Sequence, residues 1–338
     1  MSAGPLLKAP PPGVTRQADA LAFFPRGATI SAGQSVTFVI AGFHTVTFGS
    51  PKSFPLVVPF PHGKQPLLKD AAGAPMWWAG NAPLLSLNPR SVPQIGGTTI
   101  SSASQVRSSG LLRVLTAGNK QPKPYTLTFE KPGLYHFFCI VHPGMEGAIR
   151  VLPSTATAPS PDQAATRGQA ELTRIIGDVK GIQSTNPTEK LAVWVGSGKL
   201  NGASVTSFFP NRLVVNAGET VKFVSHDPLD IHTVTFGPKA YVGQIEKTFI
   251  SPKLTFNPFG VFPSEPPAPM LLIEPPPPPA PAVYDGANHG NGYLNAGIVY
   301  PYAGPQKPHL VRITFTKPGI YHYECVVHQN MDGTIVVH

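Results

Sequence analysis

The sequence predicts an all-β protein built from two tandem β-sandwiches. The chain has 41 prolines and 33 glycines among 338 residues, which favours strands and loops over long helices. Several short segments alternate apolar and polar residues, as strands with one buried face do. Two parts of the chain also repeat each other, and the length suffices for two domains that each bury a core. One sandwich per repeat is therefore expected.

The repeat is visible in three separate stretches. Its copies are FFPRGATISAGQSVTF (23–38) and FFPNRLVVNAGETVKF (208–223), HTVTFG (44–49 and 232–237), and FEKPGLYHFFCIVHPGMEGAIRV (129–151) and FTKPGIYHYECVVHQNMDGTIVV (315–337). The offset between the copies stays between 185 and 188 residues. We therefore predict a first domain at 14–152, a linker at 153–190 and a second domain at 191–338.

The linker begins with a stretch rich in Pro, Ser, Thr and Ala and then changes to a helical pattern. Leu172, Ile175, Ile176 and Val179 recur at helical spacing, and Gly181 is available as a stop. One short amphipathic helix is expected here, with its apolar stripe packed against a domain.

The alternation within each repeat indicates which residues face inward. In the first repeat these are Val36, Phe38, Ile40, His44, Val46 and Phe48. On the late strands the inward residues are Tyr135, Phe137 and Cys139, and in the second copy Tyr321, Tyr323 and Cys325. Each cysteine is thus expected to point inward at the end of its strand, while His136 and His322 point outward.

Composition excludes several classes of protein. The net charge is +9, but the basic residues are scattered, so a nucleic-acid surface is not indicated. A positive field would instead favour redox partner proteins with acidic surfaces. The sequence contains no run of eighteen apolar residues, so no transmembrane segment is predicted. The first residues, MSAGPLLKAPPPG, lack the apolar core of a signal peptide.

The chemistry lies in a group of four potential metal ligands that each repeat contains. A Cys is followed by a His after three residues and by a Met after three more, and a distant His opens HTVTFG. The two sets are His44, Cys139, His142 and Met145, and His232, Cys325, His328 and Met331. Two imidazoles and a thiolate with a weak thioether are the ligands of blue-copper electron-transfer sites, whereas zinc prefers four strong ligands.

These motifs resemble the cupredoxins, the type 1 blue copper proteins. The resemblance rests on C-x-x-H-x-x-M, on PG-x-Y-H-[FY] before it and on H-T-V-T-F upstream, and the short Cys-to-Met loop is most similar to that of amicyanin. It implies a Greek-key sandwich with one copper per domain, hence two type 1 copper ions per chain, and electron transfer without catalytic residues.

The sequence departs from the family pattern in two ways that bear on the sites. An Asn usually follows the first His in the family, and Thr45 and Thr233 stand there instead. The backbone N–H of this residue can still donate to the thiolate sulfur. The hydrogen bond by which the Asn side chain joins the two ligand loops is called into question. The Pro of amicyanin-like loops is present in the first repeat as Pro143, whereas the second repeat has Gln329 at this position. Two sites of different potential are therefore expected.

Each repeat also carries a long insertion between its first His and its Cys. These two residues are 95 positions apart in the first repeat and 93 in the second, about twice the spacing in a simple cupredoxin. The insertions are apolar and Pro-rich, so we expect them to lie over a sandwich or between the domains, partly as polyproline segments. Trp77 and Trp78 are interpreted as packing residues, and His226 as a hydrogen-bonding loop residue rather than a further ligand.

The predicted function is a soluble electron carrier. The alternatives are a two-domain copper oxidoreductase, such as a nitrite reductase or an oxidase with an additional intersubunit copper, and a copper storage or delivery protein. The chain has no His-x-His pair, and Phe138 and Glu324, not histidines, precede its cysteines. The histidines that usually bind a second copper centre and connect it to the thiolate are therefore missing. A pre-shaped site disfavours easy release of metal. Since copper is scarce in the cytosol, we expect a periplasmic or extracellular protein whose signal peptide has been removed.

Overall fold

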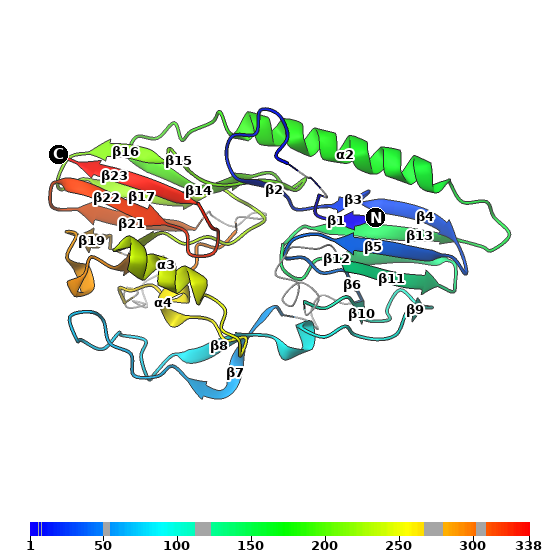
Figure 1. Ribbon diagram of the computed structural model, residues 1–338, viewed down its shortest axis with the longest axis horizontal. Helices are drawn as coiled ribbons and strands as arrows, with labels where there is room; N and C mark the ends of the chain where they lie inside the picture. The colour runs from blue at the N-terminus through cyan, green and yellow to red at the C-terminus, as the bar shows by residue number, and fades with distance from the viewer. Residues whose placement is uncertain (6, 8, 50–54, 112–122, 267–279, 302–308) are drawn as a thin grey trace, which may run out of the picture. The chain divides into compact units, whose positions relative to one another are not determined.

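The computed structural model describes the chain except for residues 6, 8, 50–54, 112–122, 267–279 and 302–308. Strands make up most of its regular structure (Figure 1), so the predicted all-β class is confirmed. The chain forms two compact units. The first consists of Met1–Val58, Leu87–Gln183 and Gly198–Ser204, and the second of Pro59–Ser86, Ser184–Ser197 and Val205–His338.

The first unit has two sheets around one core. Their strand orders are β3-β1-β5-β11-β9 and β10-β6-β12-β13-β4. The strands are β1 (Ser2–Ala3), β3 (Phe23–Phe24), β4 (Gly27–Ser31), β5 (Ser35–Ile40), β6 (Thr47–Phe48), β9 (Thr99–Ile100), β10 (Arg107–Ser108), β11 (Lys123–Phe129), β12 (Gly133–Phe138) and β13 (Glu146–Leu152), with β2 (Ala18–Ala20) and the 3-10 helix η2 (Pro89–Ser91) in the same unit. Side chains of both sheets meet in the core. For example, the rings of Phe38 on β5 and Phe137 on β12 are 5.1 Å apart.

The second unit repeats this arrangement. One sheet has the order β19-β21-β17-β14-β15, and the other has the order β16-β23-β22-β18-β20. The elements are β14 (Ala192–Gly198), β15 (Ala203–Phe209), β16 (Arg212–Val215), β17 (Thr220–Ser225), β18 (Thr235–Phe236), β19 (Ala282–Tyr284), β20 (Leu294–Asn295), β21 (Leu310–Phe315), β22 (Gly319–Glu324) and β23 (Asp332–Val337), with the helices α3 (Lys239–Lys247), α4 (Pro258–Val261) and η3 (Asn288–Gly290). The rings of Phe223 on β17 and Tyr323 on β22 lie 5.4 Å apart in this core.

The predicted alternation is confirmed in both units. All six residues expected on the inward face of the first repeat are buried, namely Val36, Phe38, Ile40, His44, Val46 and Phe48. On the late strands Tyr135, Phe137, Cys139, Tyr323 and Cys325 are buried, and Tyr321 is partly buried. His136 and His322 are exposed, as the same parity requires. Each cysteine therefore enters its core at the end of a strand.

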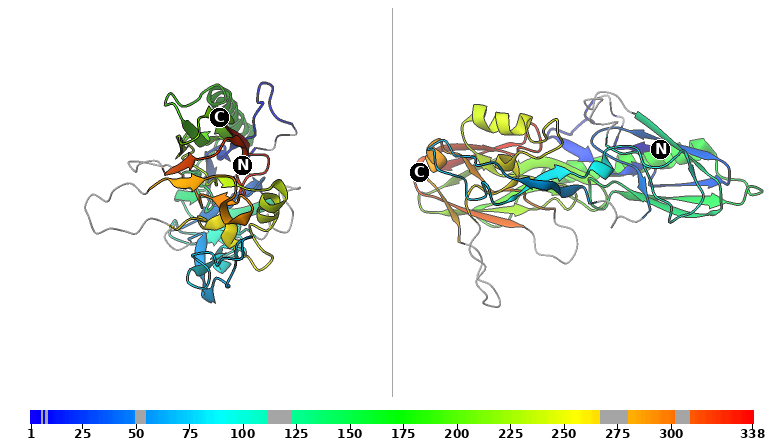
Figure 2. Two further views of the ribbon diagram at one scale, coloured as in Figure 1. Left: turned by 90° about the vertical axis from the view of Figure 1, so that its left-hand side faces the viewer. Right: turned by 90° about the horizontal axis from the view of Figure 1, so that it is seen from below.

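The linker helix is longer than the sequence pattern suggested. Helix α2 spans Pro161–Ile182 and runs along the strands of the first unit (Figures 1 and 2), packing against β2 and β3. It begins early because Ser160 and Gln163 form a capping box and Pro161 occupies the first turn, where proline is tolerated. Gly181 does not end it. No helix in the described ranges has the length and apolarity to cross a membrane.

Part of the first insertion belongs to the second unit. Strands β7 (Val57–Lys64) and β8 (Pro83–Leu87) pair there, and the buried Trp78 between them packs against Phe259 and Phe262. The Trp77 indole N–H donates to the carbonyl of Pro263 at 2.9 Å. The packing role expected for Trp78 is confirmed, whereas Trp77 is 38% exposed and makes this hydrogen bond instead of packing in a core. The division into 14–152, 153–190 and 191–338 stays a prediction, and most of the Pro-rich segment expected to be polyproline (267–279) lies outside the described residues.

A histidine between two carboxylates holds this segment to the rest of the second unit. His289 lies between two carboxylates, with Nδ1 3.0 Å from Oδ2 of Asp70 and Nε2 3.2 Å from Oε1 of Glu265. The ion pairs with Glu265 and Asp70 outweigh burial and raise the pKa of His289 above its usual value. His289 thus links the segment 59–86 to the turn around η3.

Replacing His289 with Gln should therefore lower the free energy of unfolding by about 1 kcal/mol near pH 6. A raised pKa means that the stabilisation is complete below pH 6.5 and disappears as the pH rises through the higher folded value. Denaturant titrations at pH 6 and pH 9 measure the change, with His136→Gln, at an exposed position, as the control. A deficit of equal size at both pH values would contradict the ion-pair account.

Candidate metal centres

The predicted ligands of each unit come from two connections between strands. The first His lies between β5 and β6, or between β17 and β18, and the Cys, His and Met follow the late strand β12 or β22. Backbone hydrogen bonds close both ligand loops. The Cys139 N–H donates to Met145 O at 2.8 Å and the Met145 N–H to His142 O at 3.2 Å, and the corresponding bonds of the second loop measure 2.9 and 3.3 Å. The Cys–His–Met spacing thus forms one compact turn.

In the first unit the side chains of His44, Cys139 and His142 converge. The Cys139 Sγ lies 4.0 Å from Nδ1 of His44 and 3.7 Å from Nδ1 of His142, and the two Nδ1 atoms are 3.0 Å apart. All three side chains are at most 6% exposed. Three potential ligand atoms therefore face one another in a site that is almost closed to solvent.

The second unit forms the matching group from His232, Cys325 and His328. The Cys325 Sγ is 3.7 Å from Nδ1 of His328, and the ligand atoms of all three residues lie within 4.8 Å of one another. Met145 and Met331 are each 1% exposed and end their loops within the cores. The predicted set is thus brought to one end of each core, with the methionines on the same turn as the Cys and His.

Both cysteines are set up as thiolates. Burial alone would raise their pKa, but hydrogen bonds and charge interactions with the two histidines of each group hold the pKa of Cys139 and Cys325 well below the usual value. Backbone donors add to this. The N–H groups of Thr45 and Val141 lie 3.4 Å from Cys139 Sγ, and that of Thr233 lies 3.3 Å from Cys325 Sγ. The backbone bond expected after the first His is therefore present.

The side-chain tie that the sequence called into question is also present, in another form. The Oγ1 of Thr45 accepts from the backbone N–H of Ile140 at 3.0 Å, and the Oγ1 of Thr233 accepts from Val326 at 2.9 Å. A threonine hydroxyl thus joins the first His segment to the residue after the cysteine in both units. The threonine hydroxyl accepts from a neighbouring backbone N–H, so a side-chain hydrogen bond between the two ligand segments exists without the family's Asn.

The burial and the neighbours of His232 indicate whether a metal ion fits the second group. His232 is fully buried, and its Nδ1 has no hydrogen-bond partner, while Oδ2 of Asp227 lies 3.6 Å from its Nε2. Such an orphaned nitrogen is costly unless something binds it, and a metal ion beside Cys325 Sγ would do so. Although burial opposes a charge, Asp227 and Cys325 raise the pKa of His232 to about 9. Asp227 and Cys325 thus bring negative charge next to His232.

Sequence reasoning missed a glycine that borders the first His of each group. A Cβ on Gly4 would lie 3.0 Å from Nε2 of His44, and a Cβ on Gly196 would lie 2.2 Å from Nε2 of His232. Both glycines have positive φ, +73° and +68°. Each opens the space that its histidine ring fills. In the sequence, the only sign of these two positions is a Gly near the end of a strand. Glycines are common elsewhere in the chain, so this sign does not single them out.

Two carboxylates of the second unit were also missed. Asp230 Oδ2 lies 3.0 Å from Nε2 of His328, and Asp227 Oδ2 lies 3.6 Å from Nε2 of His232. Asp230 and Cys325 outweigh burial and raise the pKa of His328 well above its usual value. His226, beside them in sequence, bonds Ser197 Oγ at 2.9 Å and stacks on Trp194, so its predicted loop hydrogen bond is confirmed.

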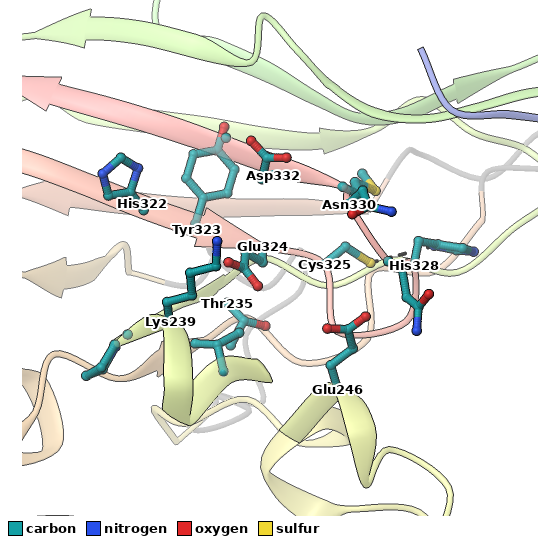
Figure 3. Close-up of a pocket in the computed structure, with 16 residues that line it drawn as sticks. Thr235, Lys239, Glu246, His322, Tyr323, Glu324, Cys325, His328, Asn330 and Asp332 are labelled. Carbon is teal, nitrogen blue, oxygen red and sulfur yellow. Dashed lines mark hydrogen bonds between the residues drawn. The ribbon is translucent and has the colours of Figure 1, made fainter. Parts of the chain in front are cut away.

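A cavity of about 670 Å³ reaches the second ligand loop. Figure 3 shows Glu324 and Cys325 at the end of β22, with His328 beyond them and with Lys239 and Glu246 of helix α3 facing them. Burial and the nearby carboxylates, Glu246 in particular, raise the pKa of Glu324. The loop that carries Cys325 and His328 is therefore reachable from outside the core.

Comparisons with known proteins complete the description. No protein-family model and no curated protein matches the chain. Its structural neighbours include auracyanin A, a "blue" copper protein from Chloroflexus aurantiacus, at 19% identity, covering 44% of this chain and 98% of that one with a TM-score of 0.27. Plastocyanin from Dryopteris crassirhizoma matches at 19% identity over 44% and 99% (TM-score 0.21), and amicyanin from Paracoccus versutus at 17% over 45% and 84% (TM-score 0.21).

Proposed function

We propose that the chain is an electron-transfer protein that holds two mononuclear type 1 copper ions, one in each unit. The observation that carries the proposal is the convergence of a buried cysteine sulfur and two imidazoles, found twice in one chain. Thiolate and imidazole are the strong ligands of such sites, and a thioether is the weak one. A bound copper supplies the Cu(II)/Cu(I) couple, which exchanges single electrons.

The residues of each group divide the task by their donor atoms. The thiolates of Cys139 and Cys325 would bind through Sγ and would give the covalent path for the electron. His44, His142 and His328 would bind through Nδ1, the nitrogen that faces the cysteine sulfur. His232 would also bind through Nδ1, since its Nε2 lies next to Asp227. The methionines would provide a weak further ligand that favours Cu(I). We assign no catalytic residue, since Phe138 and Glu324, rather than histidines, stand next to the thiolates.

Contacts within the protein hold the ligands in both units. The loop-closing hydrogen bonds and the threonine ties are made by the protein alone, and the side chains are packed into the cores. Ligands that are held in advance move little when the oxidation state changes. A small rearrangement of this kind supports rapid outer-sphere transfer.

The proposal extends to the setting of the protein. We place it outside the cytoplasm, in the periplasm or the extracellular space, because copper is held scarce in the cytosol. Its net charge of +9 suits redox partners with acidic surfaces, which a positive field would attract over distances near the Debye length.

Copper titration of the full chain tests the function. Binding is expected to saturate at two ions per chain, with an intense blue or green Cu(II) colour that mild reductants bleach and with reversible one-electron voltammetry. A third tightly bound copper together with turnover of nitrite, oxygen or a phenol would favour the oxidoreductase. Colourless Cu(I) that chelators remove readily would favour storage or delivery.

A further inference from the structure

The two proposed copper sites differ in the segment that precedes their first histidine. In the second unit the Nδ1 of His328 faces Cys325 Sγ at 3.7 Å, while its remote Nε2 lies 3.0 Å from Oδ2 of Asp230. The side chains of His328 and Asp230 are only 14% and 11% exposed. Both ring nitrogens of His328 therefore have a neighbour. Its Nε2 carries a hydrogen and donates a hydrogen bond to Asp230.

A second carboxylate lies deeper. The side chains of Asp227 and His232 are fully buried, with Oδ2 of Asp227 3.6 Å from Nε2 of His232. Local turns fix both aspartates, since Oδ1 of Asp227 accepts from the Leu229 N–H at 2.9 Å and Oδ1 of Asp230 accepts from the Ile231 N–H at 2.8 Å. Both histidines of the second group thus have a positioned carboxylate next to Nε2.

The first repeat has no carboxylate at either place. When HTVTFG is aligned in the two copies, Gly42 stands where Asp230 does. The connection from the end of β5 to His44 is also three residues shorter than that from the end of β17 to His232, so the turn that carries Asp227 has no counterpart. The two aspartates are therefore a feature of the second site.

We propose that Asp230, supported by Asp227, is a positioning residue that lowers the reduction potential of the second copper. This rests on the proposed function. A carboxylate that accepts the remote N–H makes the imidazole a stronger donor. A negative charge in a poorly solvated place also stabilises the more positive metal state. Both effects favour Cu(II) over Cu(I).

The test uses the full chain with Cys139→Ala, in which only the second site can give a thiolate–copper colour. Adding Asp230→Asn keeps the size of the side chain and removes its charge. The Cu(I)/Cu(II) equilibrium constant of the second site should rise at least tenfold, which is about 59 mV for one electron. Asp285→Asn is the matched control, because Asp285 pairs with Lys317 ahead of β22, at the end opposite to Cys325, and should leave the potential unchanged.

A second readout separates positioning from a merely structural effect. In the copper(I) form, which is diamagnetic, the Nε2 proton of His328 should give a protected nitrogen-15-coupled NMR signal that Asp230→Asn shifts and Asp285→Asn does not. If Asp230→Asn prevents folding, Asp227→Asn is measured in its place and should raise the potential in the same direction.

The outcomes distinguish the inference from the function on which it rests. A coloured second site whose potential and Nε2 signal do not respond to loss of the aspartate charge would overturn the role of Asp230 and leave the electron carrier intact. Failure of the Cys139→Ala chain to bind copper with colour would instead contradict the proposed function itself.

Discussion

Replacing Cys139 with Ala is expected to remove about half of the copper colour of the chain, and replacing Cys325 with Ala the other half. The chain contains only these two cysteines, and each is the one thiolate of its group. The remaining imidazoles can still hold a metal ion, but they cannot give a sulfur-to-copper transition. Absorbance per chain, measured together with the copper content, checks this expectation.

The fold should survive both substitutions, which makes the result interpretable. A buried Cys behaves as a small apolar side chain, so its loss should cost roughly 1 to 2 kcal/mol of stability in the metal-free chain. Circular dichroism and denaturant titration of the metal-free variants serve as the control. Undiminished colour in either folded variant would rule out the assignment of that cysteine.

Replacing Gly196 with Ala should disable the second site alone. The new Cβ would lie 2.2 Å from Nε2 of His232, so the fully buried ring would have to leave its place. The positive φ of +68° adds a backbone cost of about 1 to 2 kcal/mol. We expect copper affinity at the second site to fall at least tenfold, while the first site keeps its affinity. Equilibrium titration of Gly196→Ala in the Cys139→Ala background measures the second site directly.

Gly218→Ala is the matched control for this substitution. Gly218 lies in the same unit and also has a positive φ, +92°, but a Cβ there would meet nothing within 4 Å. It therefore carries the backbone strain without the collision with His232. If the two variants bound copper equally well at the second site, the position of His232 as a ligand would be wrong.

Sequence patterns predicted the parts of the molecule that periodicity and spacing determine. Residues of alternating character, such as Phe38 and Phe137, face the cores because a strand turns every second side chain to the same face. The same parity placed Cys139 and Cys325 at the inner end of their strands. His44 could be linked to Cys139 across 95 positions only because the motifs recur in both copies.

Other features depend on tertiary contacts that one sequence does not reveal. Pro59–Ser86 belongs to the first repeat but packs with the second unit through Trp78, and nothing local in the sequence indicates that grouping. Asp230 meets His328 across 98 positions, from a connection that differs between the repeats. The capping box at Ser160 was readable, but the Pro-rich stretch before it favoured a loop, so the start of helix α2 was placed too late.

Anomalous diffraction from crystals of the copper-loaded chain, collected at the copper edge, tests the central claim most directly. The account predicts two strong peaks, one within bonding distance of Cys139 Sγ and of Nδ1 of His44 and His142, and one within bonding distance of the corresponding atoms of Cys325, His232 and His328. Copper peaks away from the two cysteine sulfurs, in crystals of a chain that binds the metal in solution, would contradict it.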